Sequence, residues 1–183
     1  MIDKDLRHAF SVALTYDEFL QMKNLEDRFL EGRKAMLFNR LKRWGGANGK
    51  NNKAESSFCD YIEPRLTSVF DAIGYKVQYV AREFIITHGR IDFLVQAEGD
   101  RLVVVEVKHS NVHSNDDLSF SFAVGQVLTY RSVLSAGYGI DREKIDGVII
   151  TDVDSALTNL VCQNEAIRVR HVVVGDGEAS FCA

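Results

Sequence analysis

Three ionisable residues on two neighbouring strand-like segments have the types and spacing that metal-assisted chemistry needs. Asp92 lies in RIDFLVQA, and Glu106 and Lys108 lie in RLVVVEVKH, the next segment along the chain. A three-residue EGD loop centred on Gly99 would join these segments as a hairpin and set Asp92 opposite Glu106. Because side chains alternate along a strand, all three would then project from one side of the sheet.

Two opposed carboxylates about 5 Å apart repel each other by about 3 kcal/mol at an effective dielectric constant near 20. The valines around Glu106 predict a strand buried on both faces, where an uncompensated carboxylate is costly. A divalent cation would supply the missing charge, and oxygen ligands suit Mg²⁺ or Mn²⁺. With Lys108 beside the metal, the chemistry that fits is hydrolysis of a phosphodiester. The alternative is a buried Asp-Glu-Lys network without a ligand.

These segments resemble the signature of the PD-(D/E)xK nuclease superfamily, in which an acid on one strand precedes acid-any-lysine on the next. The stretch VGQVLTY resembles the Q-x-x-x-Y element on the following helix in several branches of that superfamily, here Gln126 and Tyr130. Residues four apart share a helix face, so both would lean over one site. The stretch ESSFCDYIEPRLTSVFDAIGY is similar to the helix before the core in the amino-terminal nuclease domain of type I restriction motor subunits.

The resemblance implies roles for these residues. Asp92 and Glu106 would bind the metal, and Lys108 would position the attacking water. Gln126 and Tyr130 would support the lysine or hold nucleic acid. The residue before the first acid is Ile91, where the superfamily signature has proline.

The resemblance also implies one more metal-binding acid on the preceding helix. Glu55 is favoured, because it lies on the apolar, core-facing stripe of that helix. Glu63 is its rival, since it is nearer the end of the helix and stands next to Pro64.

Length and composition place the chain among globular proteins with a single core. It has 183 residues, 46% of them apolar and 26% charged, outside the ranges of disordered and coiled-coil chains. No apolar stretch is long enough for a membrane span or a signal peptide, so a cytoplasmic location without a membrane partner is expected. The three cysteines are an odd number and widely spaced, which argues against a disulfide framework or structural zinc.

A basic segment stands out against the net charge of -4. Between residues 33 and 54 the chain has no acid and seven basic residues, which are Arg33, Lys34, Arg40, Lys42, Arg43, Lys50 and Lys53. A local positive charge on an acidic protein is typical of a surface that grips a polyanion at one place. A solvated helix face followed by a loop explains the pattern equally well.

Periodicity and turn residues predict an α/β fold. Helices are expected over residues 15–44, 53–73, 114–137 and 156–161, and strands over 75–87, 90–97, 101–109, 147–151 and 167–174. Pro64 should break the second helix, and the strand-helix-strand order near the carboxyl end implies parallel pairing. We expect residues 1–52 to form a helical appendage with a Gly/Asn loop. Residues 53–183 would form the restriction-endonuclease-like α/β/α core with a mixed central sheet that the resemblance implies.

The sequence therefore predicts a Mg²⁺- or Mn²⁺-dependent nuclease acting on DNA, with endonuclease action favoured. Two alternatives remain open. One is a catalytically silent nuclease-fold module that binds nucleic acid or a protein partner, and the other is a ribonuclease or an exonuclease. Since the chain has no recognizable specificity domain, it would find its target by its own surface, as a homodimer or with an accessory protein partner.

Overall fold

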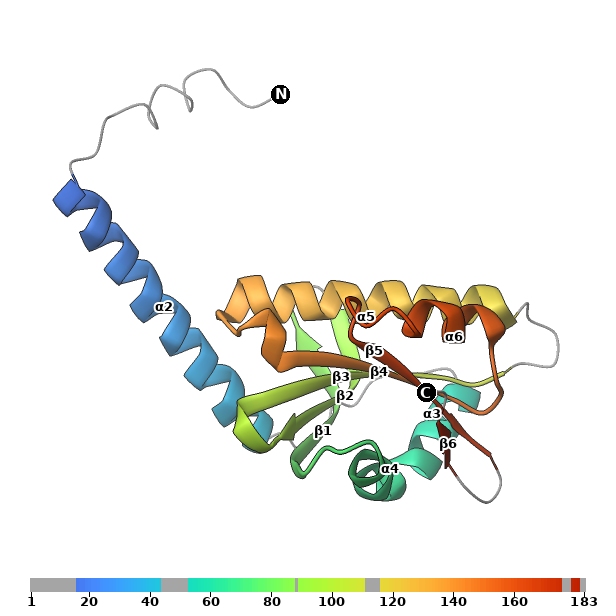
Figure 1. The fold of residues 1–183 in the computed structure, drawn as a ribbon. Coiled ribbons are helices and arrows are strands. Elements are labelled where there is room, and N and C mark those ends of the chain that lie inside the picture. Colours follow the sequence, from blue (N-terminus) through green and yellow to red (C-terminus); the bar gives the residue numbers. More distant parts are fainter. Residues whose placement is uncertain (1–15, 44–52, 88, 111–115, 176–178, 182–183) are drawn as a thin grey trace.

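The computed structural model describes residues 16–43, 53–87, 89–110, 116–175 and 179–181. Helices cover both faces of one mixed sheet, which is the expected α/β/α arrangement (Figure 1). The helices are α2 (Tyr16–Lys42), α3 (Lys53–Ile62), α4 (Leu66–Ala72), α5 (Asp116–Tyr138) and α6 (Ala156–Cys162). The strands are β1 (Val77–Ile86), β2 (Gly89–Ala97), β3 (Arg101–Lys108), β4 (Ile145–Thr151), β5 (Val169–Val174) and β6 (Ala179–Phe181). Short 3-10 turns span Glu63–Arg65, Glu98–Asp100 and Arg142–Lys144.

The six strands lie side by side in sequence order. β1, β2 and β3 form an antiparallel meander, β3, β4 and β5 run parallel, and β6 returns antiparallel to β5. The parallel pairs follow from the crossover helices α5 and α6, since a parallel connection must carry the chain back across the sheet. The meander and the parallel pairing are confirmed. β6 was not predicted, because three residues are too few to show an alternating pattern.

The expected break at Pro64 is also confirmed. α3 ends at Ile62, a 3-10 turn holds the proline, and α4 then runs to Ala72. Proline has no N–H to donate within a helix, so the chain changes direction where the ring would disrupt the hydrogen-bond ladder. Together α3 and α4 bury an apolar face against the sheet, formed by Phe58, Ile62, Leu66, Val69 and Phe70.

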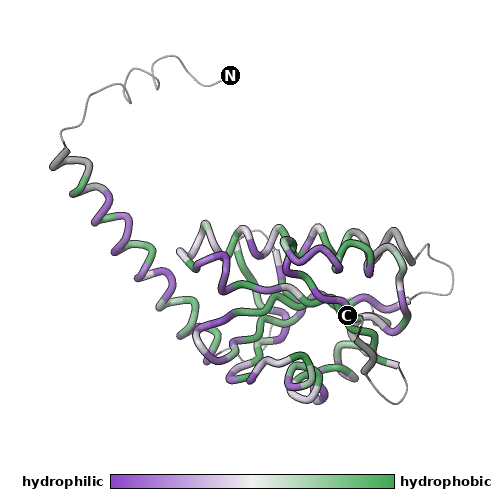
Figure 2. Tube along the Cα trace, in the orientation of Figure 1, coloured by the Kyte–Doolittle hydropathy of each residue, from purple (hydrophilic) through white to green (hydrophobic). Residues whose placement is uncertain are grey.

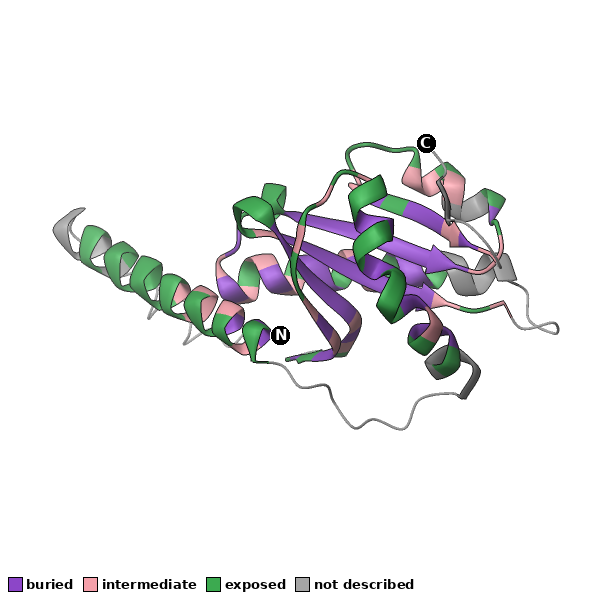
Figure 3. Ribbon diagram, turned by 90° about the horizontal axis from the view of Figure 1, so that it is seen from below, coloured by how far each residue is buried: buried purple, intermediate pink, exposed green. Residues whose placement is uncertain are grey.

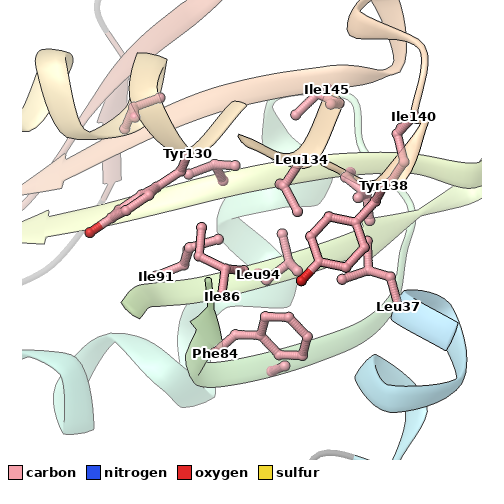
Figure 4. Packing of buried hydrophobic residues seen from close by; sticks show 14 of the residues in the cluster. Leu37, Phe84, Ile86, Ile91, Leu94, Tyr130, Leu134, Tyr138, Ile140 and Ile145 are labelled. Atoms are coloured by element: carbon pink, nitrogen blue, oxygen red, sulfur yellow. The ribbon is translucent and has the colours of Figure 1, made fainter. Parts of the chain in front are cut away.

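The sheet separates two apolar cores, and β3 contributes to both. α5 covers one face, where Leu37 and Leu41 of α2 join the cluster shown in Figure 4. α3 and α4 cover the other face. Hydrophobic residues concentrate along the strands in Figure 2, and Figure 3 shows the sheet buried between exposed helix surfaces. No described helix combines the length and the hydropathy that crossing a bilayer would require.

The hairpin between β2 and β3 has the predicted register. The pairs run from Ala97 opposite Arg101 to Phe93 opposite Val105. The three-residue loop is closed by Gly99 at φ 74°, in the left-handed region that glycine occupies at little cost. Asp92 and Glu106 come next along the two strands, immediately beyond the last of these pairs.

Candidate active site

Glu106 and Lys108 form a partly buried ion pair at the carboxyl end of β3. Glu106 is 2% exposed, and the Lys108 Nζ donates a hydrogen bond to its Oε1 over 2.9 Å. Since the two residues are two positions apart on one strand, their side chains leave the same side of the sheet. The ammonium offsets part of the cost of burying the carboxylate.

Asp92 is attached to the same strand by a different contact. Its Oδ2 accepts a hydrogen bond from the backbone N–H of Val107 over 2.8 Å. This contact lies where the regular pairing of β2 and β3 ends. One oxygen of each carboxylate is thus held by a specific donor, so the orientation of both groups is set by β3.

α5 brings Tyr130 and Gln126 to these charges. Burial raises the pKa of the Tyr130 hydroxyl, and the negative charges of Glu106 and Asp92 raise it further, while a hydrogen bond with Gln126 and the charge of Lys108 lower it. In Figure 4 the Tyr130 oxygen points away from the apolar residues of the cluster. The structure therefore places five of the six residues expected in the catalytic group around one end of β3.

The sixth residue, Glu55, lies in the first turn of α3, and its side chain is outside the described residues. Its helix is close to the site, because the ring of Phe58, one turn further on, contacts the ring of His109 at a centroid distance of 5.2 Å. His109 directly follows Lys108 in the chain. The role of Glu55 stays a prediction.

The rival acid, Glu63, has a different environment. It is exposed, and its Oε2 accepts a hydrogen bond from Arg82 Nη1 over 3.0 Å, next to a second contact from Arg82 to Asp60. Arg82 pairs with Phe93 on the side of the sheet that α3 and α4 cover. Glu63 thus has a structural partner on the opposite side from Tyr130.

The donor set at the end of β3 fits a hard divalent cation. Asp92 and Glu106 offer carboxylate oxygens, and Mg²⁺ is commonly held by one or two carboxylates together with water and substrate oxygens. Among the described side chains no group of three or more His, Cys, Asp or Glu residues is close enough to hold a metal. A third protein ligand would have to come from elsewhere, and Glu55 is the candidate.

Sequence reasoning missed a buried acid next to Asp92. Glu83 lies on β1 between residues paired with Phe93 and Ile91, so it stands across from Asp92. It is 7% exposed and has φ 50°, and Arg90 Nη1 is 3.9 Å from its Oε2. The signal in the sequence was the charged pair Arg82 and Glu83, which interrupts a strand that is otherwise mostly apolar.

The basic segment is only partly described, and some of its cations hold α2 on the body. The Arg33 guanidinium lies 4.9 Å from the centre of the Tyr138 ring, and Arg40 donates to the carbonyl oxygen of Ile85 over 2.5 Å. The remaining members divide into three groups: Lys34, Lys42 and Arg43 are described, Lys53 has an undescribed side chain, and Lys50 is outside the described residues. Binding of a polyanion by this segment stays a prediction.

A cavity of about 1200 Å³ lies at the opposite ends of β3 and β4. Its buried acid is Asp146, which accepts hydrogen bonds from Arg101, Arg168 and Tyr75. Burial favours a higher pKa for Asp146, but these three donors outweigh it and lower the pKa. Burial and the neighbouring Asp146 raise the pKa of Tyr75 to about 12. Because the charges in this network satisfy one another, we interpret it as structural.

No protein-family model matches the chain. No curated protein matches it either. A repair endonuclease from Pyrococcus abyssi is similar in structure at 20% identity and a TM-score of 0.44, covering 71% of this chain and 50% of that one. The EndoMS-dsDNA2 complex is similar at 20% identity and a TM-score of 0.45, covering 69% and 47%. This chain therefore spans about half the length of these two proteins.

A third similar structure is an fdxN element excision controlling factor protein from Anabaena variabilis. The identity is 16% and the TM-score is 0.40, with 63% of this chain and 91% of that chain covered.

Proposed function

We propose that this protein is a divalent-metal-dependent nuclease that cleaves DNA phosphodiester bonds internally. The observation that carries the proposal is the ion pair between the buried Glu106 and the half-buried Lys108, whose 2.9 Å contact lies at the end of β3. Asp92 is hydrogen-bonded to the same strand. Burying the Glu106 carboxylate, with Asp92 and Lys108 half-buried beside it, is costly for stability, and a reaction that uses these charges explains the arrangement.

Asp92 and Glu106 would hold Mg²⁺ or Mn²⁺, with Glu55 as a further ligand. When bound, the cation would neutralise charge on the phosphate and lower the pKa of the attacking water. Lys108 would orient that water or stabilise the charge that develops on the phosphate. The raised pKa of Tyr130 keeps its hydroxyl protonated, so it can donate a hydrogen bond to a phosphate oxygen.

Contacts with the phosphate backbone would come from the basic segment. Lys42 and Arg43 are exposed at the end of α2, and Lys50 and Lys53 follow in the chain. Lys42 Nζ lies 5.5 Å from the centre of the Tyr79 ring on β1. Such contacts contribute affinity that falls steeply with salt and carries little sequence information.

Cleavage assays with and without the chelator EDTA test this proposal. Circular plasmid, linear duplex, single-stranded DNA and RNA are each incubated with Mg²⁺ or Mn²⁺. We expect nicked circles only with metal, and a loss of roughly 100-fold or more in Lys108→Met. Lys144→Met is the matched control, because Lys144 is an exposed lysine at the far end of the sheet.

Each other outcome contradicts a stated part of the proposal. Activity that survives Lys108→Met or Asp92→Asn would overturn the site. Cleavage only from free ends would replace endonuclease with exonuclease action, and cleavage of RNA alone would replace the substrate. Binding of DNA without cleavage under all metal conditions would favour the catalytically silent module.

A further inference from the structure

α2 carries a second apolar stripe that does not face the body. Leu37 and Leu41 are buried against the sheet, whereas Leu25, Phe29 and Met36 are 66%, 63% and 71% exposed. Spacings of four and seven residues set these three side chains on one side of the helix, away from the side that Leu37 occupies. Large apolar side chains gathered on an exposed surface indicate an interaction site.

The amino-terminal half of α2 extends away from the body (Figure 1). Every described side chain from residue 20 to residue 29 is exposed. A stretch of helix this short is marginal in water without tertiary packing. The amino-terminal half of α2 therefore needs a partner along its apolar stripe.

Charge along α2 is divided between its two halves. Residues 16–31 contain five acids and two bases, a net charge of -3, and the acids are Asp17, Glu18, Glu26, Asp27 and Glu31. Residues 33–43 contain five bases and no acid, a net charge of +5, and the bases are Arg33, Lys34, Arg40, Lys42 and Arg43. Two such helices attract each other when antiparallel, because each acidic half meets a basic half. In a parallel pair like charges would be aligned.

We propose that α2 is a dimerisation element that pairs antiparallel with α2 of a second copy of this chain. With the two-fold axis between residues 30 and 31, Leu25 of one copy packs on Met36 of the other. Phe29 then faces Gly32, where a Cβ would meet nothing within 4 Å, so the glycine leaves room for the ring. The stripe from Leu25 to Met36 rises about 16 Å, so the two copies would bury it along the middle of the 27-residue helix. This proposal does not rest on the proposed nuclease function.

Mass measurement of the full chain over a range of protein concentrations tests the association. We expect a mass of twice 20.6 kDa for the unmodified chain and a monomer for Leu25→Glu. The matched control is Leu160→Glu, because Leu160 is 67% exposed on α6 and its variant should remain dimeric. A monomer at every concentration, or a dimer that survives Leu25→Glu, would overturn the proposal. Circular dichroism checks that each variant is folded.

Cysteine cross-linking tests the antiparallel register, in a chain that also carries Cys162→Ser and Cys182→Ser. Leu25→Cys combined with Met36→Cys should give covalent dimers under mild oxidation. Within one helix these positions are about 16 Å apart, too far for an internal disulfide. The two single variants should stay uncrosslinked. Cross-linking of either single variant, which only a parallel pair allows, would overturn the arrangement.

Discussion

The ring of Tyr130 lies directly on the backbone of Gly89. A Cβ at position 89 would stand 2.9 Å from Tyr130 Cε1 and 3.0 Å from its hydroxyl oxygen, closer than real Cβ contacts allow. The glycine that begins β2 thus makes room for the tyrosine of α5, three residues before Asp92. This contact links the two sequence elements on which the proposed nuclease site depends.

Gly89→Ala should displace the Tyr130 ring and lower DNA cleavage by about 10- to 100-fold. Stability should fall as well, because Gly89 has φ 158°, a backbone conformation that residues with a Cβ rarely adopt, so cleavage is compared at a temperature where every variant is folded. Gly137→Ala is the control on α5, where an added Cβ meets nothing within 4 Å. The effect should nearly vanish in a Tyr130→Ala background, as a double-mutant cycle requires for a shared mechanism. Equal losses in both backgrounds would refute it.

Asp92→Asn and Asp92→Ala should separate the structural contribution of this side chain from its chemical one. In the unmodified protein the Val107 N–H donates to Asp92 over 2.8 Å. The Asn side chain keeps an oxygen that can accept this hydrogen bond, so the free energy of unfolding of Asp92→Asn should stay close to that of the unmodified protein. Ala removes the acceptor and should cost about 1–2 kcal/mol. Both should lose metal-dependent cleavage. Denaturant unfolding measured beside cleavage rates checks this, and cleavage retained in Asp92→Asn would contradict a need for the charge.

Mn²⁺ should raise the thermal unfolding midpoint of the unmodified protein. A ligand that binds only the folded state at 100 times its dissociation constant adds about 2.7 kcal/mol. Glu106→Gln removes a carboxylate that is 2% exposed and should abolish this shift. Glu143→Gln, at an exposed acid in the 3-10 turn before β4, should preserve it. A full shift in Glu106→Gln would exclude Glu106 as a metal ligand.

Stability should fall as the pH drops below about 6.5, in part because of His171. This side chain is buried, with Nε2 2.7 Å from Thr151 Oγ1 and Nδ1 2.5 Å from Asn159 Oδ1. Burial lowers its pKa from the ordinary value of 6.5. Since the unfolded chain then binds a proton more readily, stability present above pH 6.5 is lost as the pH falls towards the folded-state pKa. Unfolding measured from pH 7.5 to 5 should show a shallower decline in His171→Gln, and an identical decline would contradict this assignment.

The features that could be predicted from the sequence are local or periodic. The strand-like segments at 90–97 and 101–109 and the EGD loop between them predicted the hairpin and its register, because the length of a loop sets which residues pair. Pro64 predicted the division between α3 and α4, since a missing N–H acts on its own turn of helix. The grouping of Asp92, Glu106 and Lys108 at one strand end follows from these same local rules.

Contacts between distant segments could not be predicted in this way. Periodicity places Tyr130 on one face of a helix, but it does not tell which residue of another strand that face will meet, and this proved to be Gly89. The sequence of the basic segment did not predict that Arg33 and Arg40 would contact the rest of the protein while Lys42 and Arg43 stayed exposed. Such pairings depend on how helices and sheet pack in three dimensions, where residues far apart in the chain compete for the same space. The order of residues along the chain does not show which of these distant contacts will form.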